Sequence, residues 1–496
     1  MNRGEVARGG ALSFVGAATS AAFGLGLTIG LARVLGDEGS GVVLQAMSVF
    51  AIVLALAKFG LDSTAIWLLP RVRVDDPASV PSALRTMVLL VVAVSVAVTL
   101  AFQPFISVIW GQLPLVVESV RSVMWFLPAG ALVLVLGAAL RVVGDVRAYV
   151  VYGNVALPLL RFAAVLGVAA ISSSVAAVAL AWAAPTVPVV LLLALVVARR
   201  LKPLRQTQQA DSPRRYGRDI VKFAIPRTVS AGLEQALQWI DVLIVGLIAG
   251  SAAAGVYGGA SRFVQAGLMV DAALRVVVAP RLSAALYRAD RASVQELYGL
   301  ASVWLVLFAT PLYVVLACFA PVVLSALGPD FLTGSTALVL LCLGATVTFL
   351  AGNVHSVLLM SGRSGWAAFN KAMVLTINVV GNLVLVPVVG IVGAAVAWVL
   401  AMVVDAVLAS FQVRHFVGLE FRLGPVLLAL AVAVGTYGGA CGGATLIFGS
   451  TWLALALAVA VGTVGFLLAC WLLRHRLYLQ GLLGALRGRP DAPTSK

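Results

Sequence analysis

Four polar side chains follow one another along an otherwise apolar segment of the chain. Arg227, Glu234, Gln238 and Asp241 are spaced seven, four and three residues apart, and these spacings place them on one stripe of an α-helix. Because an ionisable group is expensive to bury in hydrocarbon, such a stripe faces a cavity or a neighbouring helix rather than lipid. These side chains can form reversible interactions: charge pairing, hydrogen bonding to a polar ligand, and binding of a small cation.

A second charged group lies at the depth of the last member of this stripe. Asp241 lies nine residues before Gly250, and Arg262 lies nine residues after Ala253. Across a short turn, these positions have similar depth on antiparallel helices, so we expect Asp241 and Arg262 to pair and offset each other's desolvation. The pair is either a structural ion pair or a gate or phosphate site that exchanges partners when a substrate arrives. The sequence leaves both interpretations open.

Arg161 lies near the middle of the apolar segment 149–171, and the first half of the chain has no acid at that depth. A guanidinium there needs water, a substrate anion or an acid from the second half, where Glu234 lies at comparable depth. We expect Arg161 to face a cavity, in which its planar fork would hold a phosphate through two parallel hydrogen bonds. Local hydration with carbonyl contacts is the alternative.

Two further pairs of opposite charge have helical spacing. Lys58 and Asp62 are four residues apart, as are Asp271 and Arg275. We interpret both as ion pairs within a helix, and their corresponding places in the two halves of the chain make a cytoplasmic gate the alternative. His355 is alone in its apolar segment, which favours a hydrogen-bonded helix contact.

The elements that must position these side chains are apolar stretches of transmembrane length. A chain with 62% hydrophobic residues, 11% charged residues and a mean hydropathy of +1.07 is not a soluble globular protein. We expect an all-α polytopic membrane protein with about 14 transmembrane helices. Their predicted bounds are 9–32, 41–69, 84–109, 119–140, 149–171, 175–198, 221–249, 254–279, 297–327, 334–361, 366–387, 391–413, 423–447 and 452–473.

The positive charges mark the orientation of these helices. Most Lys and Arg residues lie at the termini and in alternate connections, whereas the other set of connections contains Arg33 and Arg121 alone. This asymmetry predicts a multi-pass protein of the cytoplasmic (inner) membrane with both termini in the cytoplasm. The net charge of +15 then reflects topology and attraction to anionic membrane lipids, so we expect no nucleic-acid partner.

The two halves of the chain share sequence markers. The pair Gly36 and Gly41 recurs 214 residues later, and Asn154 recurs 216 residues later as Asn370. Six helices per copy make parallel repeats about an axis along the membrane normal, with a cavity between two bundles. The predicted division is an N-terminal six-helix lobe (1–198), a basic cytoplasmic linker (199–220), a C-terminal six-helix lobe (221–415), two additional helices (416–475) and a cytoplasmic tail (476–496).

Cofactor and enzyme chemistry find no support in the sequence. The four cysteines lie in apolar stretches without a CxxC spacing and without a histidine placed to share a metal, so we expect no metal site and no cofactor. A polyprenyl-dependent glycosyltransferase or polymerase generally needs a sizeable outer loop with catalytic acids or arginines. The longest predicted outer connection, Pro104 to Pro114, contains neither, which argues against an enzyme.

Several motifs resemble one family of membrane transporters. The motifs are Ala32–Gly41, Lys58–Asp62, Phe223–Pro226, Asp241–Gly246, Gly255–Tyr257, Ala279–Ser283, Leu358–Gly362, Asn370, Leu385–Pro387 and Gly390–Ala395. Through them, the sequence resembles over residues 1 to about 420 the prokaryotic polysaccharide transporters, which are the lipid-linked oligosaccharide flippases of the multidrug/oligosaccharidyl-lipid/polysaccharide exporter superfamily.

The resemblance implies movement of a polyprenyl-pyrophosphate-linked glycan from the cytoplasmic to the outer leaflet by alternating access between two lobes. Arginines of the cavity would attract the pyrophosphate, while acids and amides would bind the glycan or a coupling ion, H⁺ or Na⁺. The cavity candidates are Arg161, Arg227, Glu234, Gln238, Asp241 and Arg262. Polysaccharide assembly proteins are candidate partners beside membrane lipids.

Two other transport functions belong to the same superfamily. One is a cation-coupled exporter of drugs or metabolites, a branch that typically places an intramembrane acid in each lobe, whereas Glu234 and Asp241 lie on one helix. The other is the lipid II flippase branch, whose members carry basic residues within the first helix. Residues 19–28 of this chain contain no charge, which favours an oligosaccharide precursor over the peptidoglycan precursor.

Overall fold

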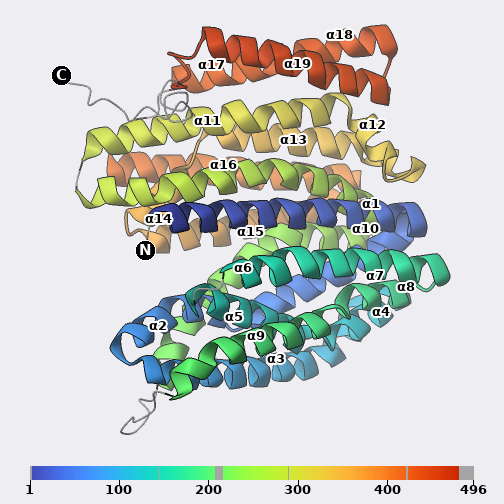
Figure 1. Cartoon of the computed structure of the whole chain (residues 1–496). Helices are drawn as coiled ribbons and strands as arrows, with labels where there is room; N and C mark the ends of the chain where they lie inside the picture. The colour runs from blue at the N-terminus through green and yellow to red at the C-terminus, as the bar shows by residue number, and fades with distance from the viewer. Residues whose placement is uncertain (1–2, 144–145, 207–215, 289, 421–422, 480–496) are drawn as a thin grey trace. The chain divides into compact units, whose positions relative to one another are not determined.

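The computed structural model of the protein describes residues 3–143, 146–206, 216–288, 290–420 and 423–479. Within these ranges the chain forms helices and no strand (Figure 1). This confirms the predicted all-α class. The described helices include 11 that are long and apolar enough to cross a membrane, or up to 12 if one bent pair forms a single span. The chain is therefore a multi-pass membrane protein.

Packing divides the chain into two compact units, residues 1–259 and 260–496. The boundary falls inside α10 (Gly217–Tyr287). The predicted division at the linker 199–220 stays a prediction, since residues 207–215 lie outside the described part of the chain. The first unit also contains α1 (Arg3–Ala57), α2 (Leu61–Asp75), η1 (Pro77–Ser79), α3 (Val80–Trp110), α4 (Pro114–Met124), α5 (Leu127–Val143), α6 (Val146–Tyr149), η2 (Val150–Ala156), α7 (Leu157–Ile171), α8 (Val175–Ala183) and α9 (Thr186–Gln206).

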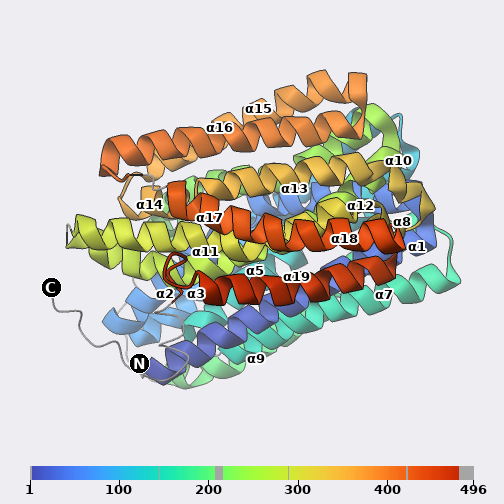
Figure 2. The same cartoon turned by 90° about the horizontal axis from the view of Figure 1, so that it is seen from above.

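Helices in the second unit lie side by side, and α15 and α16 are neighbours in Figure 2. Asn370 of α15 and Gln412 of α16 join this pair through two reciprocal amide hydrogen bonds of 2.8 Å. The elements of the unit after α10 are α11 (Arg291–Cys318), α12 (Ala320–Ser325), η3 (Pro329–Gly334), α13 (Ser335–Leu350), α14 (Val354–Met360), α15 (Ser364–Val389), α16 (Ile391–Val417), α17 (Leu423–Ala433), η4 (Val434–Gly438), α18 (Gly439–Phe448) and α19 (Trp452–Leu472).

Two spans are too long for one crossing of a membrane. Val15–Asp75 has 61 residues and Gly217–Asp271 has 55, whereas one crossing needs about 20. The helices within them break at Gly36 (φ 69°, ψ −167°) and Gly250 (φ 90°, ψ 169°). Both glycines lie in the predicted short turns, and a positive φ is readily adopted by glycine alone. The number of 14 crossings stays a prediction.

These two glycine turns contact each other reciprocally within the first unit. A Cβ atom added to Gly41 would lie 1.7 Å from the carbonyl oxygen of Ser251, and one added to Gly255 would lie 2.1 Å from that of Asp37. Asp37 and Ser251 are 214 residues apart, as are Gly41 and Gly255. The contact therefore repeats itself about a local two-fold axis, in the manner of an isologous interface, and it requires glycine at both positions.

Five predicted helices are interrupted within the described residues, which corrects the sequence-based bounds. Helix 175–198 breaks at residues 184–185 and helix 297–327 at residue 319. Of the other three, helix 41–69 breaks at residues 58–60, helix 119–140 bends by 47° between α4 and α5, and helix 334–361 breaks at residues 351–353. Where helices 41–69 and 334–361 break, Gly60 (φ 58°) and Gly352 (φ 67°) adopt left-handed backbone, which ends an α-helix. Apolar periodicity continues across such breaks, so it does not reveal them.

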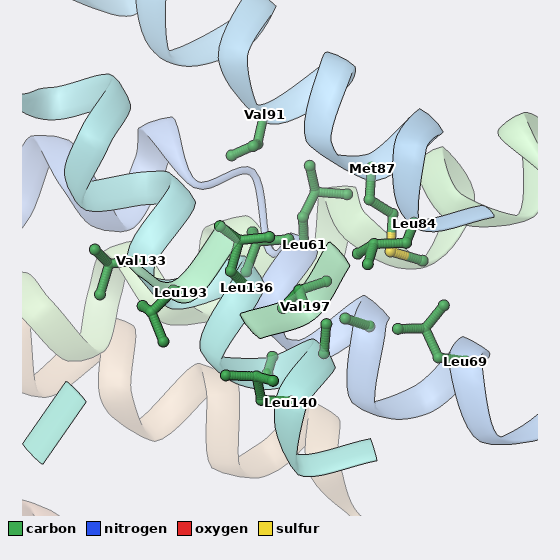
Figure 3. Packing of buried hydrophobic residues seen from close by; sticks show 14 of the residues in the cluster. Leu61, Leu69, Leu84, Met87, Val91, Val133, Leu136, Leu140, Leu193 and Val197 are labelled. Atoms are coloured by element: carbon green, nitrogen blue, oxygen red, sulfur yellow. The ribbon is translucent and has the colours of Figure 1, made fainter. Parts of the chain in front are cut away.

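A tightly packed apolar cluster holds α2, α3, α5 and α9 together in the first unit (Figure 3). Leu61, Leu69, Met87 and Leu140 are fully or almost fully buried there. Lipid tails are as apolar as leucine, so this cluster stabilises the bundle through close packing and dispersion rather than through removal of surface from water. It provides the rigid support for the start of α10, whose Ala224 belongs to the same cluster.

Candidate functional site

The predicted polar stripe occupies the part of α10 that belongs to the first unit. Arg227, Glu234 and Gln238 are exposed, whereas Asp241 is buried. Within a membrane span, charged side chains that remain exposed must meet water or a ligand, because lipid does not solvate them. The exposed members therefore indicate an aqueous or ligand-filled surface along this face of α10.

A close helix contact positions Arg227. A Cβ atom added to Gly60 would lie 2.7 Å from the carbonyl oxygen of Ala224 and 2.9 Å from Cβ of Arg227. Because residue 60 has no side chain, α10 approaches the start of α2 closely. The guanidinium Nη2 of Arg227 then donates a hydrogen bond of 3.2 Å to Oγ of Ser63. Serine leaves the positive charge uncompensated, so Arg227 can still attract an anion.

Both predicted ion pairs form, but only Asp271 and Arg275 lie within one helix. Nζ of Lys58 lies 2.8 Å from Oδ2 of Asp62, and this pair spans the break between α1 and α2. In the second unit, Nε of Arg275 donates to Oδ2 of Asp271 at 2.8 Å. Both pairs join residues four apart, which satisfies the charges locally. Their role as a cytoplasmic gate stays a prediction.

Arg161 of α7 is held by an aromatic face and a hydroxyl group. Its Cζ lies 4.2 Å from the centroid of the Trp182 ring, and its Nη2 donates a hydrogen bond of 3.2 Å to Oγ1 of Thr186. Trp182 is fixed in turn by an edge contact with Phe50, with ring centroids 5.3 Å apart. Among the described residues, the buried Nε of Arg161 has no hydrogen-bond partner.

These contacts orient Arg161 without neutralising it. Cation–π attraction and a hydroxyl acceptor stabilise a guanidinium inside a low-dielectric span, but neither carries a negative charge. The donor at Nε is also available for a further acceptor. The geometry thus suits an anion site, while the prediction that Arg161 faces a cavity between two lobes stays a prediction.

Asp241 and Arg262 have other partners in the structure. Tyr257 donates its hydroxyl hydrogen to Oδ2 of Asp241 at 3.2 Å, and Nη1 of Arg262 donates to Oε1 of Gln265 at 3.0 Å. Asp241 belongs to the first compact unit and Arg262 to the second. Their predicted pairing with each other stays a prediction.

The structure shows a contact between a histidine and an acid that the sequence does not predict. Nε2 of His355 lies 3.0 Å from Oδ2 of Asp405. Asp405 is an isolated acid in the predicted helix 391–413, which indicates that it needs a partner. The sequence does not identify that partner, because pairing with a residue 50 positions away depends on how α14 and α16 pack. The described part of the chain contains no group of three His, Cys, Asp or Glu side chains that could hold a metal ion.

Comparison with known protein families identifies the chain. A family described as "Polysaccharide biosynthesis protein" matches residues 6–286, which is more than half of the sequence. The chain belongs to this family. The match covers the glycine turns, Arg161 and the whole polar stripe of α10, and it confirms the resemblance to polysaccharide transporters. No curated protein matches the chain in sequence.

Solved structures show the same fold. An inward-facing multidrug resistance MATE family transporter of the MOP superfamily has 16% identity and a TM-score of 0.66, covering 82% of this chain and 95% of its own. The lipid II flippase MurJ in an inward closed conformation has 14% identity and a TM-score of 0.71, covering 94% and 99%. A MOP superfamily transporter from Pyrococcus furiosus has 16% identity and a TM-score of 0.58, covering 85% and 96%. Family and fold together identify a membrane transport protein.

Proposed function

We propose that this protein is a flippase that moves a lipid-linked oligosaccharide, a precursor of a polysaccharide, across the cytoplasmic membrane by alternating access. Both termini would lie in the cytoplasm. The substrate has three chemically distinct parts: an anionic pyrophosphate, a polar glycan and a polyprenyl chain. Membership of a polysaccharide biosynthesis family supports the glycan, and the fold shared with a lipid flippase and with exporters supports transport.

The observation that carries the proposal is the exposed polar face inside a membrane span of α10. Arg227, Glu234 and Gln238 remain exposed there, although a lipid-facing helix would show apolar residues. A guanidinium offers two parallel donors to a phosphate, and carboxylate and amide groups accept and donate hydrogen bonds with sugar hydroxyls. A pyrophosphate-linked glycan needs both kinds of contact.

Arg161 supplies a second cation at a different helix. Its aromatic and hydroxyl contacts hold the guanidinium in place, so little further ordering is required when an anion binds. Arg161 and Arg227 both lie in the first compact unit, and we infer that they attract the pyrophosphate during loading.

The test is a transport assay with the purified full chain in liposomes. The probe is a fluorescent polyprenyl-pyrophosphate-linked N-acetylglucosamine, whose appearance in the opposite leaflet is followed with a membrane-impermeant quencher. A hydrogen bond to a charged group contributes about 1.5–3 kcal/mol, so Arg227→Ala should slow transport roughly tenfold to a hundredfold. Arg218→Ala is the matched control, since Arg218 is an exposed arginine at the start of the same helix and should transport like the wild type.

Equal rates for Arg227→Ala and the wild type would contradict the anion role of this face. The alternative is a cation-coupled exporter of drugs or metabolites, because a multidrug transporter shares the fold. Under that alternative, the liposomes would transport a lipophilic cation such as ethidium and leave the pyrophosphate probe in place.

A further inference from the structure

A helix of the second unit is broken near its C-terminal end, after the 16 residues of α13 and before the seven residues of α14. α13 ends at Leu350 and α14 begins at Val354, and Gly352 between them has a φ of 67°. A break of this kind exposes backbone carbonyl groups inside the membrane, where they must find partners in protein or water. Discontinuous helices are also the usual places at which transporters bind substrates and coupling ions near the midplane.

Contacts from α11 fix this break. The hydroxyl group of Tyr298 donates a hydrogen bond of 2.6 Å to the carbonyl oxygen of Ala351. A Cβ atom added to Gly352 would lie 1.9 Å from Oγ of Ser302, so the close approach of α11 requires glycine there. Its left-handed backbone requires glycine as well. The packing of α11 against Ala351 and Gly352 therefore stabilises the break.

An ion pair lies beside the break. His355 belongs to the first turn of α14, and its Nε2 lies 3.0 Å from Oδ2 of Asp405. Asp405 is close to the centre of α16, about 21 Å from its start and about 18 Å from its end at 1.5 Å per residue. A carboxylate at that depth needs a partner. The histidine side chain is 30% exposed and that of Asp405 12%, which makes the imidazole the accessible member.

Two polar atoms around this pair have no hydrogen-bond partner among the described residues. They are Oδ1 of Asp405 and Nδ2 of Asn353, both buried, and Asn353 as a whole is only 5% exposed. Buried polar atoms without partners are costly. Their presence beside a helix break indicates a small polar site that takes up water or a cation during the transport cycle.

The first half of the chain lacks this arrangement. With the repeat offset of 216 set by Asn154 and Asn370, His355 corresponds to Ala139 and Asp405 to Val189. Both are fully buried, and α5 runs without interruption past residue 139. Repeat symmetry alone therefore does not explain the break or the pair, which belong to the second unit.

We propose that His355 and Asp405, at the break between α13 and α14, form a proton-binding site that couples proton movement to transport. In the neutral imidazole, Nε2 carries the hydrogen that faces Oδ2 of Asp405. A hydronium ion transfers its proton to Nδ1, so one O–H bond of the hydronium breaks, an Nδ1–H bond forms and a water molecule is released, and the net charge of the pair changes from −1 to 0. The doubly protonated imidazolium then holds the carboxylate through a charge-assisted hydrogen bond.

Other charged or titratable groups on the helices around α14 have separate surroundings. Tyr298 donates to Ala351, Arg363 lies 4.2 Å over the ring of Phe416, and the exposed His415 stacks on Phe411. Asp405 is the carboxylate that contacts His355. The remaining groups are Arg291, Glu296, Tyr313 and Cys318 on α11, Cys342 on α13, Lys371 on α15, Arg414 on α16, Arg262, Asp271, Arg275, Arg281 and Tyr287 on the second-unit part of α10, and Arg288 just after α10.

Proton binding is tested on the full chain in lipid nanodiscs, independently of transport. The chain has three histidines, so His355→Gln identifies the imidazole ¹⁵N signals of His355 in the labelled protein. We expect these signals to change with pH, and Asp405→Asn to alter this response because the imidazolium loses its carboxylate. ¹⁵N signals of His355 that do not change with pH, or a response to pH that Asp405→Asn leaves unchanged, would overturn the proposed proton-binding site.

Coupling rests on the proposed flippase function and is tested with the fluorescent pyrophosphate-linked probe in liposomes. One proton per cycle gives at most about a tenfold change per pH unit, or 1.36 kcal/mol. We expect a gradient of one unit to raise the wild-type rate severalfold, His355→Gln to lose this response, and His415→Gln to keep it. Thermal unfolding checks that each variant is folded, and Asp405→Asn provides a second variant without the response.

The outcomes separate the two proposals. A wild type that transports the probe with no response to the pH gradient, or with a response that His355→Gln retains, overturns coupling and leaves the flippase function intact. A response to a sodium gradient in place of the pH gradient also overturns it. A wild type that moves no probe contradicts the flippase function and its coupling, whereas the ¹⁵N titration still decides whether the pair binds a proton.

Discussion

The reciprocal glycine contact makes Gly41→Ala an informative substitution. The new Cβ atom would lie 1.7 Å from the carbonyl oxygen of Ser251, while real Cβ contacts stay above 3.0 Å, so the two backbones must separate by about 1.3 Å. Overpacking typically costs about 1–3 kcal/mol, and a backbone obstacle favours the upper end. Alanine returns roughly 1 kcal/mol of helix propensity, which leaves a net loss of about 2 kcal/mol.

The assay is thermal unfolding of the purified protein in one detergent. A loss of about 2 kcal/mol should lower the midpoint by roughly 2–5 °C in a chain of this size. Gly24→Ala is the matched control, because nothing lies within 4 Å of a Cβ atom added at Gly24. Its midpoint should stay the same or rise by about 1–2 °C, as expected when alanine replaces glycine in a helix.

A double variant sharpens the test. Gly255→Ala opposes Asp37 across the same contact, so one separation of the backbones relieves both clashes. The combined loss in Gly41→Ala with Gly255→Ala should therefore be smaller than the sum of the single losses. The reasoning is refuted if Gly41→Ala is as stable as Gly24→Ala, since the two turns would then not be packed through their glycines.

Three further predictions concern individual contacts and the topology. Trp182→Leu removes the cation–π partner of Arg161 and should slow transport of the pyrophosphate-linked probe about tenfold or more, whereas an unchanged rate would contradict that role. Asn370→Leu leaves the buried amide of Gln412 unpaired and should cost about 1–3 kcal/mol in thermal unfolding, while adding Gln412→Leu should recover most of it. Ser173→Cys should react with an impermeant thiol reagent in intact cells, and labelling only after the membrane is opened would reverse the topology.

Sequence patterns predict the helices well because lipid imposes strong constraints on them. Spans must be apolar and about 20 residues long, and the turns at Gly36 and Gly250 carry glycine because the backbone there requires it. The same reasoning located the helical ion pair of Asp271 and Arg275, whose spacing is a property of a single helix. These features depend on local geometry alone.

The remaining features depend on tertiary packing. The break near Gly352 exists because Tyr298 and Ser302 of α11 approach it, and apolar periodicity continues through it. The partners of Arg161 and Asp405 come from other helices, 21 to 50 residues away in sequence. Equal depth in the membrane limits which side chains of other helices can contact Arg161 or Asp405. The rotation of each helix about its axis then decides which of these side chains makes the contact.

The central claim is that the protein flips a lipid whose anionic headgroup is recognised by intramembrane arginines. The most direct measurement compares initial flipping rates in liposomes for two fluorescent lipids that share the polyprenyl chain and the N-acetylglucosamine and differ only in the pyrophosphate. The account predicts that the wild type moves the pyrophosphate lipid at least about tenfold faster than the neutral one, since one charged hydrogen bond contributes about 1.5–3 kcal/mol. Equal rates for the two lipids, or no movement of either beyond protein-free liposomes, would contradict it.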